Sequence, residues 1–161
     1  MKITRLNGGR FVLPNTDNDW ENKCTSNSGG VFLPYSKELL ELVSNALGTD
    51  ITEDHSLREG VVVSVYTGCG TCDGDQYGRQ RRGLAVFAPD LTLRYRKQTP
   101  VLSPDQGPGA IDKLGIEDAR ITYIDGRFIL WYCGYNGDKG LPCCAVSRDL
   151  IHWEKIGRAH V

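Results

Sequence analysis

The stretch that decides the fold runs from Gly115 to Tyr135 and has the sequence GIEDARITYIDGRFILWYCGY. Two runs rich in β-branched and aromatic residues, 121–124 and 128–132, flank the dipeptide Asp125-Gly126. An Asp-Gly pair between two such runs is a strong signal for a β-hairpin with a tight turn. The second run is too short for a helix. The sequence therefore predicts two antiparallel strands, with the charged group Glu-Asp-Ala-Arg at 117–120 where the first strand begins.

Bulk composition bounds the class of protein. The chain has 161 residues, the size of one domain, and 19 basic against 20 acidic residues give a net charge of −1. This balance gives no sign of a nucleic-acid or membrane partner. The 19 glycines and seven prolines imply many turns, which favours an all-β fold. Residues 1–6 lack the apolar core of a signal peptide, so we expect a cytoplasmic protein.

Six cysteines raise the question of metal binding and disulfides. Cys69 and Cys72 form a C-x-x-C motif, and Cys143 and Cys144 are adjacent. A zinc site would need a second C-x-x-C or a histidine pair at ligand spacing, so we predict no metal site. Because no export signal is present, we expect the cysteines to be reduced. The sequence assigns no role to the C-x-x-C motif.

A helix is predicted only for Ser36 to Leu47, where apolar residues recur at spacings of three and four. Ser36 suits the N-cap, and Gly48 suits the position after the last turn. The Ser/Asn/Gly-rich segment Cys24 to Gly30 predicts a loop, and so does the Gly- and Asp-rich segment 67–78. Further strands are expected at 60–66, 83–87, 90–95 and 143–147.

An internal repeat indicates the architecture. Residues 60–68 match 126–134 at Gly, Tyr and Gly, with an offset of 66 residues from Gly60 to Gly126. Ala85-Val86 and Asp90-Leu91 recur as Ala145-Val146 and Asp149-Leu150. A unit of about 60 residues made of short strands points to a β-propeller, although its period exceeds the usual ~40–50.

Two repeats cannot close a ring, because each would leave exposed sheet edges. We therefore expect residues 1–161 to form one incomplete propeller domain, the N-terminal part of a longer protein. Residues 156–161 match what a common sequencing-adapter sequence encodes. They are either a non-native tail or a genuine one, and His160 receives no role under either interpretation.

The carboxylates Glu117 and Asp118 beside Arg120 have two interpretations. In the first, an ion pair simply pins the entrance of a blade. In the second, one carboxyl in a closed channel mouth keeps a raised pKa and acts as general acid on a glycosidic oxygen. An inverting enzyme then needs water or an external nucleophile such as phosphate on the opposite face of the sugar. Arginines suit phosphate because of their forked geometry.

Several motifs in this order resemble glycoside hydrolase family 130, the β-mannoside phosphorylases and related β-mannosidases. They are GIEDARIT at 115–122 with Asp125-Gly126 and Tyr132, and DLIHW at 149–153. WEN at 20–22 is followed by NSGG at 27–30, and YGRQRRGLA at 77–85 is similar to the family's Ser-Arg-x-Gly-Leu-Ala strand. The resemblance covers most of the chain from Trp20 to Trp153.

The resemblance implies a five-bladed propeller with its site at the central channel, of which this chain supplies about two blades and a lead-in. It implies inverting phosphorolysis of β-mannosides to α-mannose 1-phosphate, with inorganic phosphate as co-substrate and no cofactor. Asp118 matches the general acid, whose proton passes through a sugar hydroxyl. Arg81 and Arg120 match arginines that line the sugar and phosphate subsites. Asn27 matches an asparagine near the non-reducing mannose, and Glu117 is expected to orient Arg120 or Asp118.

Departures from the family pattern leave alternatives open. Ala119 stands where proline is usual, Thr67 stands where an arginine is common, and the helix at 36–47 looks like an insertion. The alternatives are a β-mannoside hydrolase on the same fold, which would use water, and a non-catalytic sugar-binding propeller. Another five-bladed family, such as the invertase-like enzymes, would need a further aspartate near the start of the first blade, in an apolar strand. Asp17 and Asp19 lie in a polar stretch instead. We expect this chain alone to be inactive, and the whole protein could form homo-oligomers.

Overall fold

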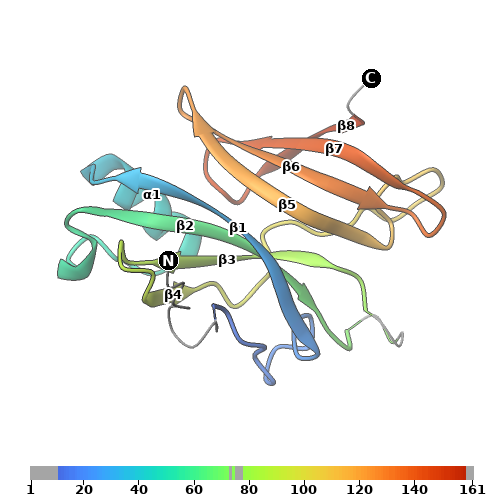
Figure 1. Cartoon of the computed structure of the whole chain (residues 1–161), viewed down its shortest axis with the longest axis horizontal. Coiled ribbons are helices and arrows are strands. Elements are labelled where there is room, and N and C mark those ends of the chain that lie inside the picture. Colours follow the sequence, from blue (N-terminus) through green and yellow to red (C-terminus); the bar gives the residue numbers. More distant parts are fainter. Residues whose placement is uncertain (1–10, 73, 75–77, 159–161) are drawn as a thin grey trace, which may run out of the picture.

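The chain folds into two four-stranded antiparallel sheets, and each sheet follows the order of the sequence (Figure 1). The computed structural model describes residues 11–72, 74 and 78–158. The first sheet, here called blade 1, contains β1 (Cys24–Pro34), β2 (Gly60–Cys69), β3 (Arg81–Phe87) and β4 (Leu93–Arg96). Blade 2 contains β5 (Gly115–Ile124), β6 (Arg127–Tyr135), β7 (Gly140–Ser147) and β8 (Trp153–Arg158). The predicted all-β fold, a partial propeller with two blades, is confirmed.

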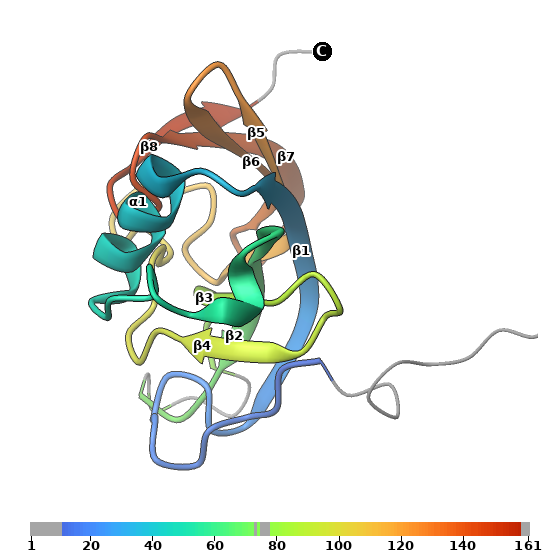
Figure 2. The same cartoon turned by 90° about the vertical axis from the view of Figure 1, so that its left-hand side faces the viewer.

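The two blades meet along their first strands, because β5 contacts β1 more than any other strand of blade 1. The predicted helix is confirmed as α1 (Lys37–Leu47), inserted between β1 and β2. The Ser36 hydroxyl accepts a hydrogen bond from the Leu39 amide at 3.4 Å, and Gly48 ends the helix with φ 74°. Figure 2 shows α1 between the two sheets. Its buried face joins one apolar core with both blades, through Leu40, Val43, Ala46 and Leu47.

The predicted hairpin is confirmed in β5 and β6. Asp125 has φ 49° and Gly126 has φ 72°, so both turn residues are left-handed, as a two-residue turn of type I′ requires. Ile124 pairs with Arg127 directly across the turn. The turn therefore sets the register that places alternate side chains of β6 in the core.

The internal repeat is confirmed strand by strand. The segments 60–68 and 126–134 are the second strands of the two blades, β2 and β6. Leu91 and Leu150, which follow the third strands, have φ 65° and 68°. The aspartate before each leucine accepts a backbone N–H two residues further on at 2.9 Å. The same local chemistry therefore turns the chain from third to fourth strand in both blades.

A buried polar cluster in blade 1 ties its outer strand to the segment that precedes β1. The Tyr66 hydroxyl donates to Glu21 Oε2 at 2.8 Å, and both residues are fully buried. Arg96 in β4 donates through Nε to the Tyr66 oxygen at 2.8 Å and through Nη2 to Glu21. Burial raises the pKa of Tyr66, so its hydroxyl stays protonated and keeps donating.

Blade 2 repeats this arrangement with different residues. Tyr132 donates to Asp112 Oδ2 at 3.4 Å, and Lys155 in β8 bonds the same oxygen at 2.7 Å. Lys155 also donates to the Ser103 carbonyl at 2.9 Å. Asp112 precedes β5 by the same three residues by which Glu21 precedes β1. The equivalence of Tyr66 and Tyr132 predicted from the sequence therefore extends to their acidic and basic partners.

Two sequence-based expectations about the ends of the strands are wrong. The Ser/Asn/Gly-rich segment from Cys24 is not a loop, because it pairs with β2 as the first part of β1. Strand β2 likewise continues through Cys69 into the segment expected to be a loop. Hydrogen bonds to a neighbouring strand override the weak local preference here. At the other end, residues 156–158 lie in β8, and residues 159–161, His160 included, lie outside the described part.

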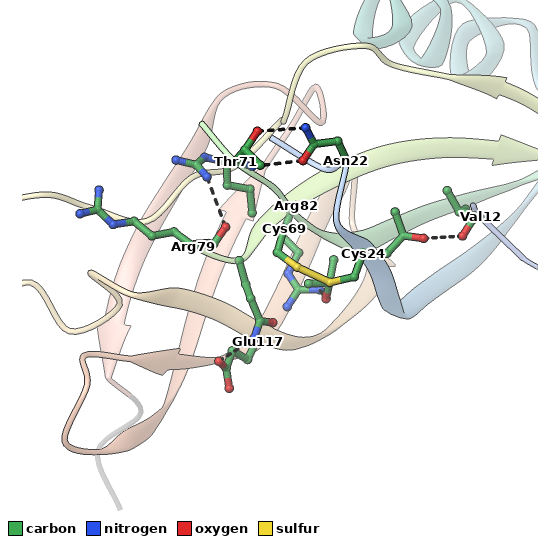
Figure 3. Close-up of a disulfide and its surroundings, with 12 residues drawn as sticks. Val12, Asn22, Cys24, Cys69, Thr71, Arg79, Arg82 and Glu117 are labelled. Carbon is green, nitrogen blue, oxygen red and sulfur yellow. Dashed lines mark hydrogen bonds between the residues drawn. A yellow bond between two sulfur atoms is a disulfide. The ribbon is translucent and has the colours of Figure 1, made fainter. Parts of the chain in front are cut away.

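The expectation of reduced cysteines is also wrong for one pair. Cys24 and Cys69 pair across β1 and β2 with their Cα atoms 5.4 Å apart, and they form a disulfide (Figure 3). The antiparallel register brings the two thiols together, which no sequence spacing indicated. Next to the bond, the Asn22 and Thr71 side chains are hydrogen-bonded at 2.9 Å. The disulfide therefore closes the end of blade 1 where β1 begins.

Candidate active site

The charged group at 117–120 forms a β-bulge in the first strand of blade 2. Pairing between β5 and β6 passes from Glu117 opposite Cys133 to Arg120 opposite Trp131, which leaves residues 118 and 119 as the bulge. Asp118 has φ 49°, a left-handed conformation that non-glycine residues seldom adopt. Its side chain is exposed, whereas Ala119 is buried. Bulges of this kind often re-aim a side chain next to a functional site.

The first strand of blade 1 contains the same bulge at the same place. Pairing between β1 and β2 passes from Ser26 opposite Thr67 to Gly29 opposite Val65, which leaves Asn27 and Ser28 unpaired. The partners Thr67 and Val65 correspond to Cys133 and Trp131 at the repeat offset of 66, from Gly60 to Gly126. The backbone position of Asn27 in blade 1 is therefore that of Asp118 in blade 2. The side chain of Asn27 lies outside the described part.

The two bulges touch. A Cβ on Gly29 would lie 2.6 Å from the Ala119 carbonyl oxygen and 3.0 Å from Arg120 Cα. Only glycine allows backbones to approach so closely. The predicted site positions Asn27 and Asp118, 91 residues apart in the sequence, therefore lie on adjoining bulges.

The segment that leads into β3 lies against the start of β5. Gln80 forms a parallel bridge with Gly115, and the Ile116 amide donates to the Gln80 carbonyl at 3.0 Å. The Gln80 side chain donates to Glu117 Oε1 at 2.8 Å. Arg81 follows at the start of β3, where it is half-buried and donates to the Arg79 carbonyl at 3.2 Å. The predicted residues Arg81 and Glu117 are thus brought to the same end of the two blades.

The surroundings of Glu117 raise the pKa of its carboxyl. Burial raises the pKa of Glu117, the negative charge of Asp118 raises it further, and the positive charge of Arg82 lowers it. Adjacent carboxyls that differ in exposure, here Glu117 and Asp118, are a common arrangement in acid–base sites.

Arg120 is exposed and braces the bulge itself. Its Nη1 donates to the carbonyl of Ala119 at 2.9 Å. This contact fits a residue that stabilises the bulge, and guanidinium donors suit an anionic or hydroxylated ligand.

Sequence reasoning selected Arg81 and missed its neighbour Arg82, which is fully buried. Arg82 Nη1 donates to Thr67 Oγ1 at 2.5 Å, and Nη2 donates to the Ile116 carbonyl. Figure 3 shows Arg82 close to the Cys24–Cys69 disulfide. The signal was present in the alternation of a strand, because two adjacent arginines must point to opposite faces. One of the pair had to enter the interior.

Two negative findings concern the described residues only. They contain no group of three or more His, Cys, Asp or Glu side chains that could hold a metal ion. None of their helices is long and apolar enough to cross a membrane.

Comparisons with known proteins identify relatives of the chain. No family model matches. A 1,2-β-oligomannan phosphorylase from Thermoanaerobacter sp. (strain X514) is 28% identical over 98% of this chain and 45% of that protein. A β-1,2-mannobiose phosphorylase from the same organism is 25% identical over 95% of this chain and 45% of that protein. The chain therefore spans about half the length of the curated relatives it matches.

A solved structure supports the same assignment at the level of the fold. It comes from work on the GH130 family of mannoside phosphorylases, described as containing glycoside hydrolases that target β-1,2 mannosidic linkages in Candida mannan. It matches 96% of this chain and 40% of its own, with a TM-score of 0.66 and 22% identity. The chain is therefore similar in sequence to two mannoside phosphorylases and has the fold of a GH130 protein, and the resemblance indicated by its motifs is confirmed.

Proposed function

We propose that the protein containing this chain is a glycoside phosphorylase that cleaves β-mannosides by inverting phosphorolysis and releases α-mannose 1-phosphate. The observation that carries the proposal is the contact between two equivalent bulges, which brings the positions of Asn27 and Asp118 together on adjoining first strands. Both curated relatives are named as phosphorylases of β-1,2-mannosides. We infer the whole protein's activity from them, because the chain spans about 45% of their length.

Asp118 is the proposed general acid. Its proton passes through a sugar hydroxyl to the glycosidic oxygen as the bond from that oxygen to the anomeric carbon breaks. A phosphate oxygen forms the new bond from the opposite face, so the β-configured substrate gives an α-configured product. The two adjacent carboxyls of Glu117 and Asp118, which differ in exposure, support an acid–base role at this position.

The other predicted residues are proposed ligand contacts. Arg81 and Arg120 would bind sugar hydroxyls and phosphate, for which guanidinium donors are well suited. Asn27 would contact the non-reducing mannose. Glu117 would hold Asp118 or Arg120 in place, which its hydrogen bond from Gln80 supports by fixing its own carboxyl.

The proposed partners are a β-mannoside oligosaccharide and inorganic phosphate, with no other cofactor, and the reaction is a glycosyl transfer to phosphate. Nucleic acid and membranes are not proposed partners, and a homo-oligomer stays a prediction for the whole protein. The cytoplasm also stays a prediction. A stable disulfide such as Cys24–Cys69 would be exceptional there, because cytosolic thiols are kept reduced.

The test uses the full gene product and this chain side by side. Each is incubated with short β-1,2-mannosides, with and without phosphate, and both mannose 1-phosphate and free mannose are assayed. Asp118→Asn is compared with Asp125→Asn, the same chemical change in the hairpin turn between β5 and β6. Asparagine tolerates the left-handed φ of 49° found at both positions, so both variants should keep the fold.

We expect phosphate-dependent mannose 1-phosphate that falls at least about 100-fold in Asp118→Asn and is unchanged in Asp125→Asn, as loss of a general acid predicts. Free mannose without phosphate would replace the proposal by a hydrolase that uses water. Mannoside binding with neither product would replace it by a non-catalytic sugar-binding propeller.

A further inference from the structure

Arg82 occupies an unusual position for a charged residue. It is fully buried, yet it donates to the Ile116 carbonyl, directly before residues 117–120, here called the carboxylate bulge. Its guanidinium connects three strands: it starts on β3, donates to Thr67 on β2 and donates to the Ile116 carbonyl on β5. The Arg82 carbonyl also accepts from the Val101 amide at 2.8 Å, so the backbone of the residue is fixed as well.

We propose that Arg82 is a positioning residue for the carboxylate bulge: it anchors β5 at Ile116 and places a fixed positive charge behind Glu117 and Asp118. The inference rests on the proposed function, because it assigns Arg82 a task in the acid–base chemistry of that same site. It does not require Arg82 to touch the substrate.

The charge of Arg82 has to be compensated from the bulge. Among the residues that the structure describes, its guanidinium donates to two neutral acceptors, the Thr67 hydroxyl and the Ile116 carbonyl. Among the described residues Nε has no hydrogen-bond partner. A buried cation without a nearby negative charge is strongly unfavourable. Burial lowers the pKa of Arg82 to about 10, the negative charges of Asp118 and Glu117 oppose this shift, and the positive charge of Arg120 adds to it.

The coupling works in both directions. Burial and the charge of Asp118 raise the pKa of Glu117, whereas the charge of Arg82 lowers it. Cys133, opposite Glu117 on β6, has a raised pKa and stays a neutral thiol. Gln80 adds a neutral hydrogen bond to Glu117. Arg82 is therefore a cation that limits the rise in the pKa of Glu117. It thereby affects how often Glu117 is negatively charged next to Asp118.

A purely mechanical brace would behave differently. An apolar side chain of similar volume can replace a buried ion at little cost to stability when it packs well. Such a replacement would keep the blades together and would still remove the charge. The pKa of Glu117 therefore separates a charge-positioning role from simple packing.

The test is a pH titration of the Glu117 carboxyl by carbon-13 NMR on this chain, with Glu117→Gln to assign the signal. Arg82→Met removes the charge and keeps much of the side-chain volume. Arg82→Lys keeps the charge but removes the planar guanidinium that donates to two acceptors. Thr67→Val removes one acceptor and leaves the cation. Arg94→Met, at a cation that bonds Asp54 instead, is the matched control.

In Arg82→Met we expect the Glu117 pKa to rise by about one pH unit, the low end of what a close opposite charge produces. In Arg82→Lys the Glu117 pKa should stay close to its wild-type value, because the positive charge is kept. The backbone amide signals of residues 117–120 should move, because lysine cannot hydrogen-bond Thr67 and Ile116 at the same time in the manner of a guanidinium. Thr67→Val and Arg94→Met should leave the Glu117 pKa within a few tenths of a unit.

A folded Arg82→Met with an unchanged Glu117 pKa overturns the proposal. If Arg82→Met does not fold, Arg82→Lys decides: unmoved amide signals at 117–120 overturn the anchoring role, and moved signals support it. None of these results depends on turnover. A failed phosphorolysis assay would therefore reject the proposed function without touching the measured coupling, and an absent coupling would reject only the role of Arg82.

Discussion

Removing the Cys24–Cys69 disulfide should destabilise the chain substantially. The bond joins two residues that are 45 apart in the sequence, and it closes the segment that contains β1, α1 and β2. In the chain-entropy description, a cross-link over this separation removes about 4 kcal/mol of conformational freedom from the unfolded chain. For a chain of this size, that corresponds to a fall in melting temperature of about 8–16 °C.

The measurement compares urea unfolding with and without the reductant TCEP. Reduction should lower the free energy of unfolding of the wild-type chain by about 2–4 kcal/mol, less than the full entropy term when the reduced unfolded chain keeps some structure. The double variant Cys24→Ala/Cys69→Ala should start from the lower value and show no response to reductant. Cys72→Ser should keep the full response, because this cysteine belongs to the C-x-x-C motif but lies outside the bond.

Thiol counting gives the refuting result directly. Of the six cysteines, four lie outside the disulfide, so the unfolded, unreduced chain should titrate four thiols. A count of six would show that the bond is absent and that the sequence-based expectation of reduced cysteines holds. If Cys72→Ser abolished the response to reductant, the bond would instead join the two cysteines of the C-x-x-C motif.

Two further predictions concern the contact between the bulges and the stability at low pH. Gly29→Ala should lower the free energy of unfolding by about 1–3 kcal/mol, because its Cβ would lie 2.6 Å from the Ala119 carbonyl oxygen, and backbone cannot move aside. Gly30→Ala, whose nearest neighbour is a side-chain methyl at 3.3 Å, should cost clearly less in the same urea titration, and equal costs would contradict the contact. Burial raises the pKa of Asp54, but hydrogen bonds from Ser56, Tyr95 and Arg94 together outweigh it and lower the pKa to about 2. Asp54 therefore adds stability above its ordinary pKa near 4, and this stability is lost as the pH falls towards 2. In Asp54→Asn the fall in melting temperature between pH 4 and 2 should be shallower, and an unchanged slope would refute the assignment.

Local sequence signals determined the elements that need few partners. The left-handed turn at Asp125-Gly126 and the cap at Ser36 depend on residues within one turn of the chain, so composition at those positions was sufficient to predict them. The repeat was also visible, because the same strand and turn residues return where the same backbone is built twice. The ordered motifs led to the family and to Asp118 as a candidate.

The tertiary structure decided what depends on register and on which face a side chain occupies. No local rule distinguishes Arg81 from Arg82, and only the pairing of β3 with β2 and its contact with β5 of the other blade bury the second. The disulfide follows from the antiparallel pairing of β1 with β2 across 45 residues. The equivalence of Asn27 and Asp118 was likewise hidden, because the inserted helix shifts the repeat offset between the first and second strands. Local preferences act over a few residues, whereas a site is assembled by contacts between strands, and those contacts exist only in the folded chain.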